Sequence, residues 1–158
     1  MREKQAAYNR YEYWLASLVA LSGRKKIYLR TVFADAKGLY HASPQTLERI
    51  CVLTGREQQA IQAAQGRSEE ELEGQLKYWV QNGIHLAVWG QEDYPARLEH
   101  IYIPPYALFY RGSCPQSARS AIGIVGARNC THYGKAVAEQ IGKELALAGV
   151  RVISGMAA

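Results

Sequence analysis

Residues 121–158, AIGIVGARNCTHYGKAVAEQIGKELALAGVRVISGMAA, contain the pattern that decides the fold. The stretch opens with a short apolar run rich in β-branched residues, and Gly126 ends that run at a turn. The apolar residues that follow recur at spacings of four, four and three, at Val137, Ile141, Leu145 and Ala148. This periodicity predicts an amphipathic helix that Gly149 closes, before a second β-branched run ends at Ser154 and Gly155. Strand, helix and strand within about forty residues predict a βαβ unit with parallel strands.

The carboxyl ends of the two predicted strands carry small or polar residues. Gly126 follows the first strand, and Ser154 and Gly155 follow the second. Ligands of open α/β sheets bind beyond the carboxyl ends of parallel strands. We therefore place the candidate functional site at these two turns, which are expected to lie side by side.

The composition is that of a globular protein with a modest positive charge. Hydrophobic residues make up 48% of the 158-residue chain, and the net charge is +5. This charge permits a polyanionic partner without requiring one. No apolar run approaches the roughly 18 residues that span a bilayer, and the N-terminus lacks the apolar core of a signal peptide. We therefore expect no membrane association and a cytoplasmic location.

The cysteines and histidines do not form a metal-binding or catalytic motif. Cys51, Cys114 and Cys130 are widely spaced without a CxxC pair, which fits neither a disulfide framework nor a zinc site. The histidines show no HExxH or HxH spacing, and neither GxSxG nor a Walker A sequence is present. We expect no catalytic residues and no metal site.

The chain changes character near residue 83. Before that point, five short helices are predicted, at about residues 8–21, 25–37, 44–54, 56–65 and 68–82. Ser43-Pro44 is a typical helix start, and Ser68 with Glu71 forms a capping box. Beyond that point, residues 84–89 and 107–110 are strand-like. We therefore expect a helical domain at residues 1–82 and an α/β domain at residues 83–158.

Five short segments of the second half of the chain stand out in a fixed order: Tyr94-Pro95-x-x-Leu98, Pro104-Pro105 with LFYRG at 108–112, IGIVGAR at 122–128, Thr131-x-Tyr133-Gly134 and VISGMA at 152–157. By these segments, residues 94–157 resemble the DNA-processing protein A family, also called DprA or Smf, which serves bacterial natural transformation. The helical region is similar only in kind to the sterile-alpha-motif-like (SAM-like) domain that precedes the core in many family members.

The resemblance implies a fold between the α+β and α/β classes, in which a SAM-like helical domain precedes a Rossmann-like parallel α/β domain. The family continues beyond residue 158 with a further Gly-Ile-Asp and several more strands. We therefore expect the N-terminal portion of such a protein, truncated within an incomplete Rossmann-like domain. The uncovered edge and face of its sheet predict that residues 84–158 alone are marginally stable, while the helical domain folds independently.

The resemblance also implies a function. It implies a protein that binds single-stranded DNA, protects it and helps to load a RecA-type recombinase, without hydrolysis and without a cofactor. It implies a homodimer in the full-length protein, and the regions for dimerisation and recombinase contact are expected in the part that this chain lacks.

The candidate DNA-binding residues lie at the two turns and at the start of the helix between them. The guanidinium of Arg128 can pair with phosphate oxygens, although an arginine there can equally be a surface residue or a structural ion pair. Thr131 is placed to cap the helix, whose free N–H groups favour an anion. The complete set is Gly126, Arg128, Thr131, Tyr133, Gly134, Lys135, Ser154 and Gly155.

Two residues of this set and the neighbouring Ala127 bear on the hypothesis in different ways. The helix dipole disfavours a cation at Lys135, which suggests an anion nearby, but a solvated lysine is a comparable interpretation. Tyr133 is a candidate for base stacking or a phosphate bond. The family's Gly-Ser-Arg turn has Ala127 in place of serine here, which removes a hydroxyl that could bond a phosphate.

Two other functions remain open on the sequence. Nucleoside-monophosphate phosphoribohydrolases of the lysine-decarboxylase-like family share a strand, a glycine turn and a following helix, and their catalytic glutamate would lie beyond residue 158. A pure interaction module, in which the helical domain recruits a protein, is the second alternative. The helical domain also holds a basic cluster that is either a solvated helix start or an auxiliary DNA surface: Arg24, Lys25, Lys26 and Arg30.

Overall fold

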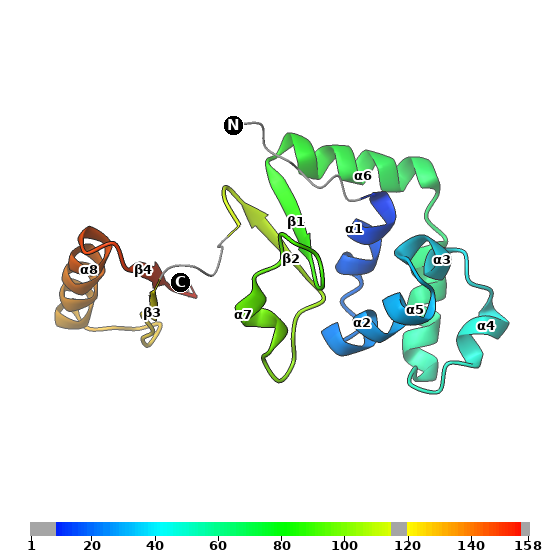
Figure 1. Ribbon diagram of the computed structural model, residues 1–158, viewed down its shortest axis with the longest axis horizontal. Helices are drawn as coiled ribbons and strands as arrows, with labels where there is room; N and C mark the ends of the chain where they lie inside the picture. The colour runs from blue at the N-terminus through cyan, green and yellow to red at the C-terminus, as the bar shows by residue number, and fades with distance from the viewer. Residues whose placement is uncertain (1–8, 115–119, 156–158) are drawn as a thin grey trace. The chain divides into compact units, whose positions relative to one another are not determined.

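The computed structural model describes residues 9–114 and 120–155, which contain both helices and strands (Figure 1). The chain divides into two compact units, residues 1–116 (the first unit) and residues 117–158 (the second unit). No helix among the described residues is long and apolar enough to cross a membrane.

Helices α1 to α6 of the first unit each begin at a side-chain cap. The helices are α1 (Arg10–Ser17), α2 (Gly23–Val32), α3 (Ala36–Tyr40), α4 (Pro44–Glu48), α5 (Gly55–Gln65) and α6 (Glu69–Gln81). The residue before each helix accepts a hydrogen bond from a backbone N–H of the first turn. The capping box predicted for Ser68 and Glu71 is confirmed, and Thr54 with Glu57 forms a second one at α5.

The helix predicted at residues 25–37 is wrong at its C-terminal end. The structure ends α2 at Val32 and starts a separate helix, α3, at Ala36. Ala34 between them has a φ of 61°, a left-handed conformation that a helix cannot contain. The carboxylate of Asp35 then caps α3 by accepting a hydrogen bond of 2.6 Å from the backbone N–H of Gly38. Gly38 therefore lies inside a helix, whereas the sequence pattern placed it at a helix end.

Two antiparallel strands pack on the helices of the first unit. The strands β1 (Ile84–Val88) and β2 (Ala107–Arg111) are joined by a connection that contains the short helix α7 (Ala96–Glu99). Leu86, Val88 and Tyr106 belong to the same buried core as Trp14 and Leu15 of α1. The domain boundary that we expect after residue 82 thus runs through this core.

A buried carboxylate ties the first helices to the residue that precedes β2. Glu12 is only 6% exposed, and its carboxylate accepts a hydrogen bond of 2.8 Å from Nε of Arg30 and another from the hydroxyl of Tyr106. Burial, followed by the charge of Glu12, raises the pKa of Tyr106 far above its usual range. The hydroxyl therefore stays protonated and donates to the carboxylate at all ordinary pH values.

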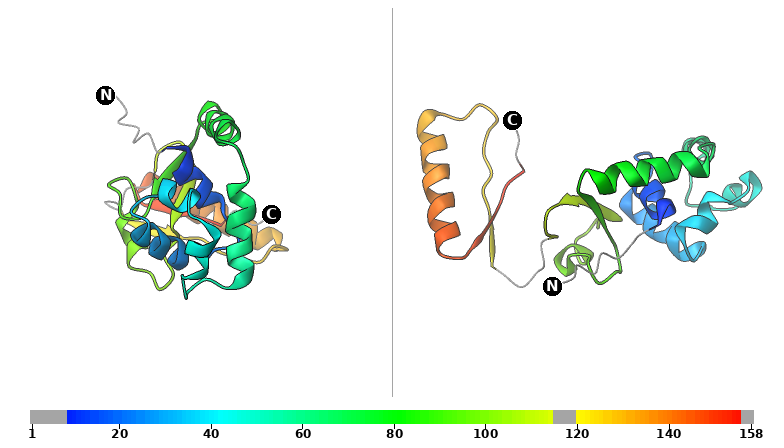
Figure 2. Two further views of the ribbon diagram at one scale, coloured as in Figure 1. Left: turned by 90° about the vertical axis from the view of Figure 1, so that its right-hand side faces the viewer. Right: turned by 90° about the horizontal axis from the view of Figure 1, so that it is seen from above.

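The second unit is a βαβ unit, as the sequence predicts. It consists of β3 (Ala121–Gly123), α8 (His132–Leu147) and β4 (Arg151–Ile153), and β3 pairs with β4 in parallel. Gly149 follows α8 with a φ of 76°, the left-handed conformation with which many helices end. Figure 2 shows α8 lying alongside the two strands. Large apolar side chains of this unit stay exposed, among them those of Ile122, Ile141, Leu147 and Ile153.

Candidate functional site

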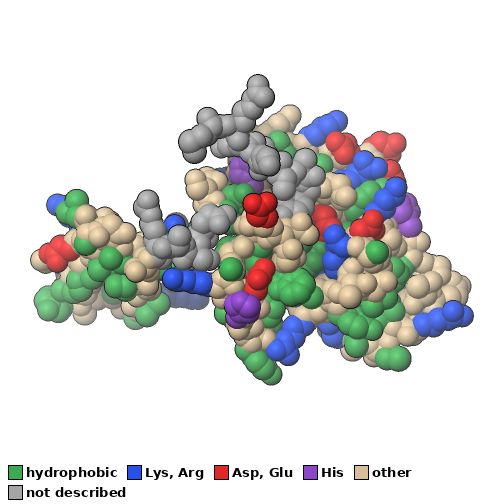
Figure 3. Space-filling view, viewed as in Figure 1, with side chains coloured by type: hydrophobic (Ala, Val, Ile, Leu, Met, Phe, Trp, Pro, Cys, Tyr) green, Lys and Arg blue, Asp and Glu red, His purple; other side chains and the backbone are tan. Residues whose placement is uncertain are grey.

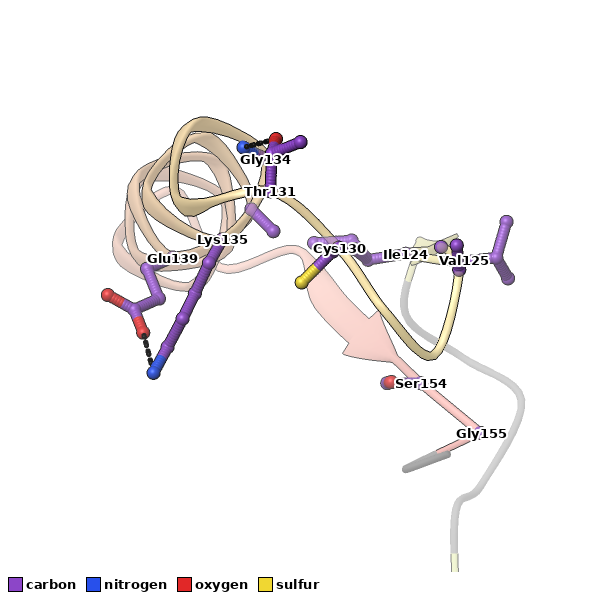
Figure 4. A pocket seen from close by; sticks show the side chains of 12 residues that line it. Ile124, Val125, Cys130, Thr131, Gly134, Lys135, Glu139, Ser154 and Gly155 are labelled. Atoms are coloured by element: carbon purple, nitrogen blue, oxygen red, sulfur yellow. Dashed lines mark hydrogen bonds and ion pairs between the residues drawn. The ribbon is translucent and has the colours of Figure 1, made fainter. Parts of the chain in front are cut away.

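A pocket of about 600 Å³ lies where the two strands of the second unit end. Its wall is formed by the turn after β3, by the first turns of α8 and by the residues after β4 (Figure 4). The lining residues are Ile124, Val125, Gly126, Ala127, Cys130, Thr131, Gly134, Lys135, Ala138, Glu139, Ser154 and Gly155.

The parallel pairing of the strands brings their carboxyl ends together. The backbone N–H of Ile124, just after β3, donates to the carbonyl of Ile153 at 2.9 Å, so that the ladder continues past the strand. The residues that follow on the two strands are therefore Val125 and Gly126 on one side and Ser154 with Gly155 on the other. This pairing places the two turns on one pocket wall.

The start of α8 is organised by Thr131. Its hydroxyl accepts a hydrogen bond of 3.1 Å from the backbone N–H of Gly134, and its carbonyl accepts one of 3.0 Å from that of Lys135. These two bonds satisfy the N–H groups of Gly134 and Lys135. Because the first N–H groups of a helix have no partner within the helix, those of His132 and Tyr133 stay available for another acceptor.

The pocket runs along one side of α8. Residues 131, 134, 135, 138 and 139 line it, and this spacing of three and four defines a single helical face. Figure 4 shows Thr131, Lys135 and Glu139 along this side of the helix. Tyr133 lies outside this set of positions; it is 79% exposed and does not line the pocket.

The carboxylate of Glu139 lies at the pocket wall beside Lys135, the cation that the sequence predicts for the site. Nζ of Lys135 lies 4.0 Å from Oε1 of Glu139, one turn further along α8, and both side chains are exposed. Such an exposed pair contributes little to stability, about 0.3–0.5 kcal/mol for this helical spacing. Its effect on the site is electrostatic, because Glu139 offsets part of the positive charge that an anion would meet.

The structure brings six of the eight predicted site residues together. Gly126, Thr131, Gly134, Lys135, Ser154 and Gly155 line the pocket, whereas Arg128 and Tyr133 do not. Arg128 is exposed in the loop between β3 and α8, and it forms no ion pair with any described residue. It is therefore not neutralised by a carboxylate of the described chain.

Two polar or reactive residues of the pocket were not predicted from the sequence. Glu139 could have been found, since its position four residues after Lys135 is a typical spacing for a helical ion pair. Cys130 is an exposed free thiol at the pocket wall, and no sequence signal distinguishes it from Cys51 or Cys114. No group of side chains that could hold a metal ion is found among the described residues.

The basic cluster of the first unit does not form one cationic surface. Nζ of Lys25 lies 2.6 Å from Oε2 of Glu57, and Arg30 is bonded to the buried Glu12. Lys26 is itself buried and donates to the carbonyl of Ala16 at 2.7 Å. On the face of the first unit that Figure 3 shows, Lys and Arg side chains are interspersed with Asp and Glu side chains. Of the four cluster residues, Arg24 alone is an exposed cation outside these pairings.

Comparison with known proteins gives the class to which this part of the chain belongs. Residues 85–158 match the family described as DNA recombination-mediator protein A, and this segment belongs to that family. The resemblance seen in the motifs at residues 94–157 is thereby confirmed.

Two curated relatives carry the names by which the family is known. Over 83 residues, 52% of this chain, the sequence is 37% identical to the DNA processing protein DprA of Bacillus subtilis, of which these residues cover 28%. Over 72 residues, 46% of this chain, it is 33% identical to Protein Smf of Borreliella burgdorferi, with 23% of that protein covered. The chain thus spans about a quarter of the length of the curated relatives it matches.

Proposed function

We propose that the chain is part of a DNA recombination-mediator protein that binds single-stranded DNA, and that the pocket of the second unit holds the phosphate backbone of the strand. One observation carries this proposal. A single pocket combines the carboxyl ends of β3 and β4 with the first turns of α8, and it lies within the residues that match the family. In this account the βαβ unit is the first part of a Rossmann-like domain, and helices α1 to α6 form a SAM-like domain.

The chemistry of the pocket suits a phosphate group. Backbone N–H groups at Gly126 and Gly155 can approach an oxygen closely, because no Cβ stands in the way. Lys135 supplies a positive charge at the wall, and Arg128 supplies a second one from the neighbouring loop. The described residues 120–155 contain four Lys or Arg against two Glu, a balance that favours a polyanion.

Contacts of this kind position a strand without reading its sequence. We therefore propose a protein that covers incoming DNA whatever its sequence and passes it to a RecA-type recombinase, as in natural transformation. The proposal includes a homodimer of the full-length protein. It requires neither a catalytic residue nor a cofactor.

The phosphoribohydrolase alternative is not favoured. The family that matches residues 85–158 is a recombination mediator, and both relatives are named for DNA processing or Smf. Release of free base from a nucleoside monophosphate by the purified protein would revive that alternative.

Affinity for a labelled oligothymidylate tests the proposal. At low salt, Arg128→Ala and Lys135→Ala should each weaken binding by about three- to ten-fold, the loss expected for one phosphate contact. Lys143→Ala is the matched control, because Lys143 is an exposed cation of α8 that does not line the pocket. An unchanged affinity for Arg128→Ala would remove Arg128 from the site, and unchanged affinity for both variants would contradict the proposed interface.

A further inference from the structure

The loop between α7 and β2 is held firmly against the start of α2. A Cβ on Gly23 would collide with the carbonyl oxygen of Pro104 and would lie 3.1 Å from the backbone nitrogen of Tyr106. The two backbones therefore touch directly, which only glycine permits. On the other side of the loop, the hydroxyl of Tyr94 donates to the carbonyl of Pro105 at 2.6 Å. Two consecutive prolines further restrict the backbone here.

This anchored loop nevertheless presents three large apolar side chains to solvent. Ile101, Tyr102 and Ile103 are consecutive and exposed, and Tyr102 is 80% exposed. In Figure 3, hydrophobic side chains adjoin a Lys or Arg side chain at the lower edge of the first unit, below α7. A loop whose backbone is fixed loses little further entropy when its side chains bind a partner.

The ring of Tyr102 is paired with the guanidinium of Arg24. Cζ of Arg24 lies 4.5 Å from the centroid of the ring, and its Nη2 donates to the carbonyl oxygen of Tyr102. The first contact is a cation–π interaction, and the second holds the same guanidinium to the loop backbone. The pair is thus an exposed aromatic surface with a planar cation already in place.

The charge of Arg24 is not offset by a carboxylate. Arg24 forms no ion pair with any described residue, in contrast to Lys25 and Arg30 of the same helix. Arg24 lies in the first turn of α2, where the helix dipole disfavours a cation, and no acidic residue of that turn offsets this effect. An anion bound here would relieve both costs. Tyr28, one turn further along α2 on the same face as Arg24, is a second exposed aromatic.

We propose that Arg24 and Tyr102 form a second contact for single-stranded DNA, in which a base stacks on the Tyr102 ring and Arg24 binds the adjoining phosphate. This inference rests on the proposed function, and it adds a contact on the first unit. Proteins that bind single strands without sequence preference stack bases on aromatic rings and bind the phosphate backbone with basic side chains such as arginine. A nucleotide offers both a flat base for the exposed ring and an anion for the uncompensated cation, and these are the two features that the pair presents.

Photocrosslinking locates the base directly. The 158-residue chain is irradiated with an oligothymidylate that carries 5-iododeoxyuridine, and the adducts are mapped by mass spectrometry. We expect an adduct on Tyr102. Adducts that map to other aromatic residues and never to the 100–105 loop would overturn the inference.

Affinity variants give the second readout. Tyr102→Ala should weaken oligothymidylate binding by about five-fold or more, whereas Tyr102→Phe, which keeps the ring, should stay within about two-fold of the wild type. Arg24→Ala should weaken binding and lower the slope of log affinity against log salt by about one. Tyr78→Ala is the matched control, since Tyr78 is 60% exposed on α6 and lies on neither proposed contact. It should bind as the wild type does.

The outcomes separate this inference from the proposed function. If Arg128→Ala and Lys135→Ala weaken binding while Tyr102→Ala does not, the second contact is refuted and the pocket stands. If Tyr102→Ala alone weakens binding, the pocket is refuted and the second contact stands. If the wild-type chain binds no oligothymidylate at low salt, both proposals fail.

Discussion

At the scale of single residues, Lys135 and Glu139 place opposite charges next to each other at the wall of the pocket. Both side chains are exposed, and Nζ lies 4.0 Å from Oε1. Glu139 lines the pocket in which we propose a phosphate, and two negative charges close together repel each other. An acidic residue in a DNA-binding pocket makes an unusual prediction possible, because its removal should strengthen binding.

We predict that Glu139→Gln raises the affinity for oligothymidylate by about two- to five-fold at low salt, since the amide keeps the shape and removes the repulsion. Fluorescence anisotropy measures the change. Glu144→Gln is the control, because Glu144 is exposed on α8 and does not line the pocket. Weaker binding by Glu139→Gln would mean that Glu139 helps to build the site.

The residues of the site differ in how far the sequence could predict them. Gly126, Ser154 and Gly155 follow strands whose parallel order the pattern indicates, and parallel order alone brings the strand ends together. The positions of Arg128 and Tyr133 depend on the path of an irregular loop and on the rotation of α8, which periodicity does not determine. Cys130 lines the pocket because of the path of this same loop, and the residues around it in the sequence do not predict that position.

At the scale of elements, α2 is attached to α1 through a buried amine. Nζ of Lys26 donates to the carbonyl of Ala16 at 2.7 Å, and burial lowers the pKa of Lys26 to about 8 from its ordinary value of 10.5. The unfolded chain therefore binds this proton more tightly than the folded chain does. Between these two pKa values the unfolded state holds more protons, so the free energy of unfolding should rise with pH there.

Lys26→Met should abolish this rise, because the variant keeps the apolar stem and removes the titrating group. Urea unfolding of both proteins at several pH values between 7 and 10.5, under reducing conditions, gives the comparison. The unfolding free energy of the variant minus that of the wild type should fall as the pH rises, because only the wild type gains stability there. A constant difference would show that Lys26 titrates normally.

Element boundaries show what a sequence pattern can and cannot establish. The βαβ unit follows from two β-branched runs and a long amphipathic helix, which are strong periodic signals. The break between α2 and α3 depends on the left-handed φ of Ala34 and on the Asp35 cap. Alanine has no preference for that conformation, so the apolar periodicity of residues 25–37 predicts one uninterrupted helix.

At the scale of the whole molecule, the core of the first unit crosses the expected boundary at residue 82. Leu86, Val88 and Tyr106 pack with the helices, and the hydroxyl of Tyr106 donates to the buried Glu12. Composition marks the change from helical to strand-like residues, but it does not reveal that the strands complete the core of the helices. The structure therefore gives a reason to expect that residues 1–82 do not form a stable domain by themselves.

We predict that a fragment of residues 1–114 unfolds cooperatively and is more stable than a fragment of residues 1–82 by more than about 3 kcal/mol. Removing β1 and β2 exposes several buried side chains, each of which contributes about 1.5–3 kcal/mol. Urea denaturation followed by circular dichroism measures both fragments. Equal unfolding free energies would show that the helical region is an independent domain, as its composition suggests.

The central claim is that the turns after β3 and β4, with the start of α8, hold a phosphate backbone. It is tested most directly by the backbone N–H resonances of Gly126, Gly134 and Gly155 in a ¹⁵N–¹H correlation spectrum of the 158-residue chain, titrated with oligothymidylate at low salt. We predict that these three resonances shift as the complex forms, while those of two glycines of the first unit, Gly66 after α5 and Gly74 in α6, stay in place. Binding that leaves the three pocket resonances unmoved would contradict the account.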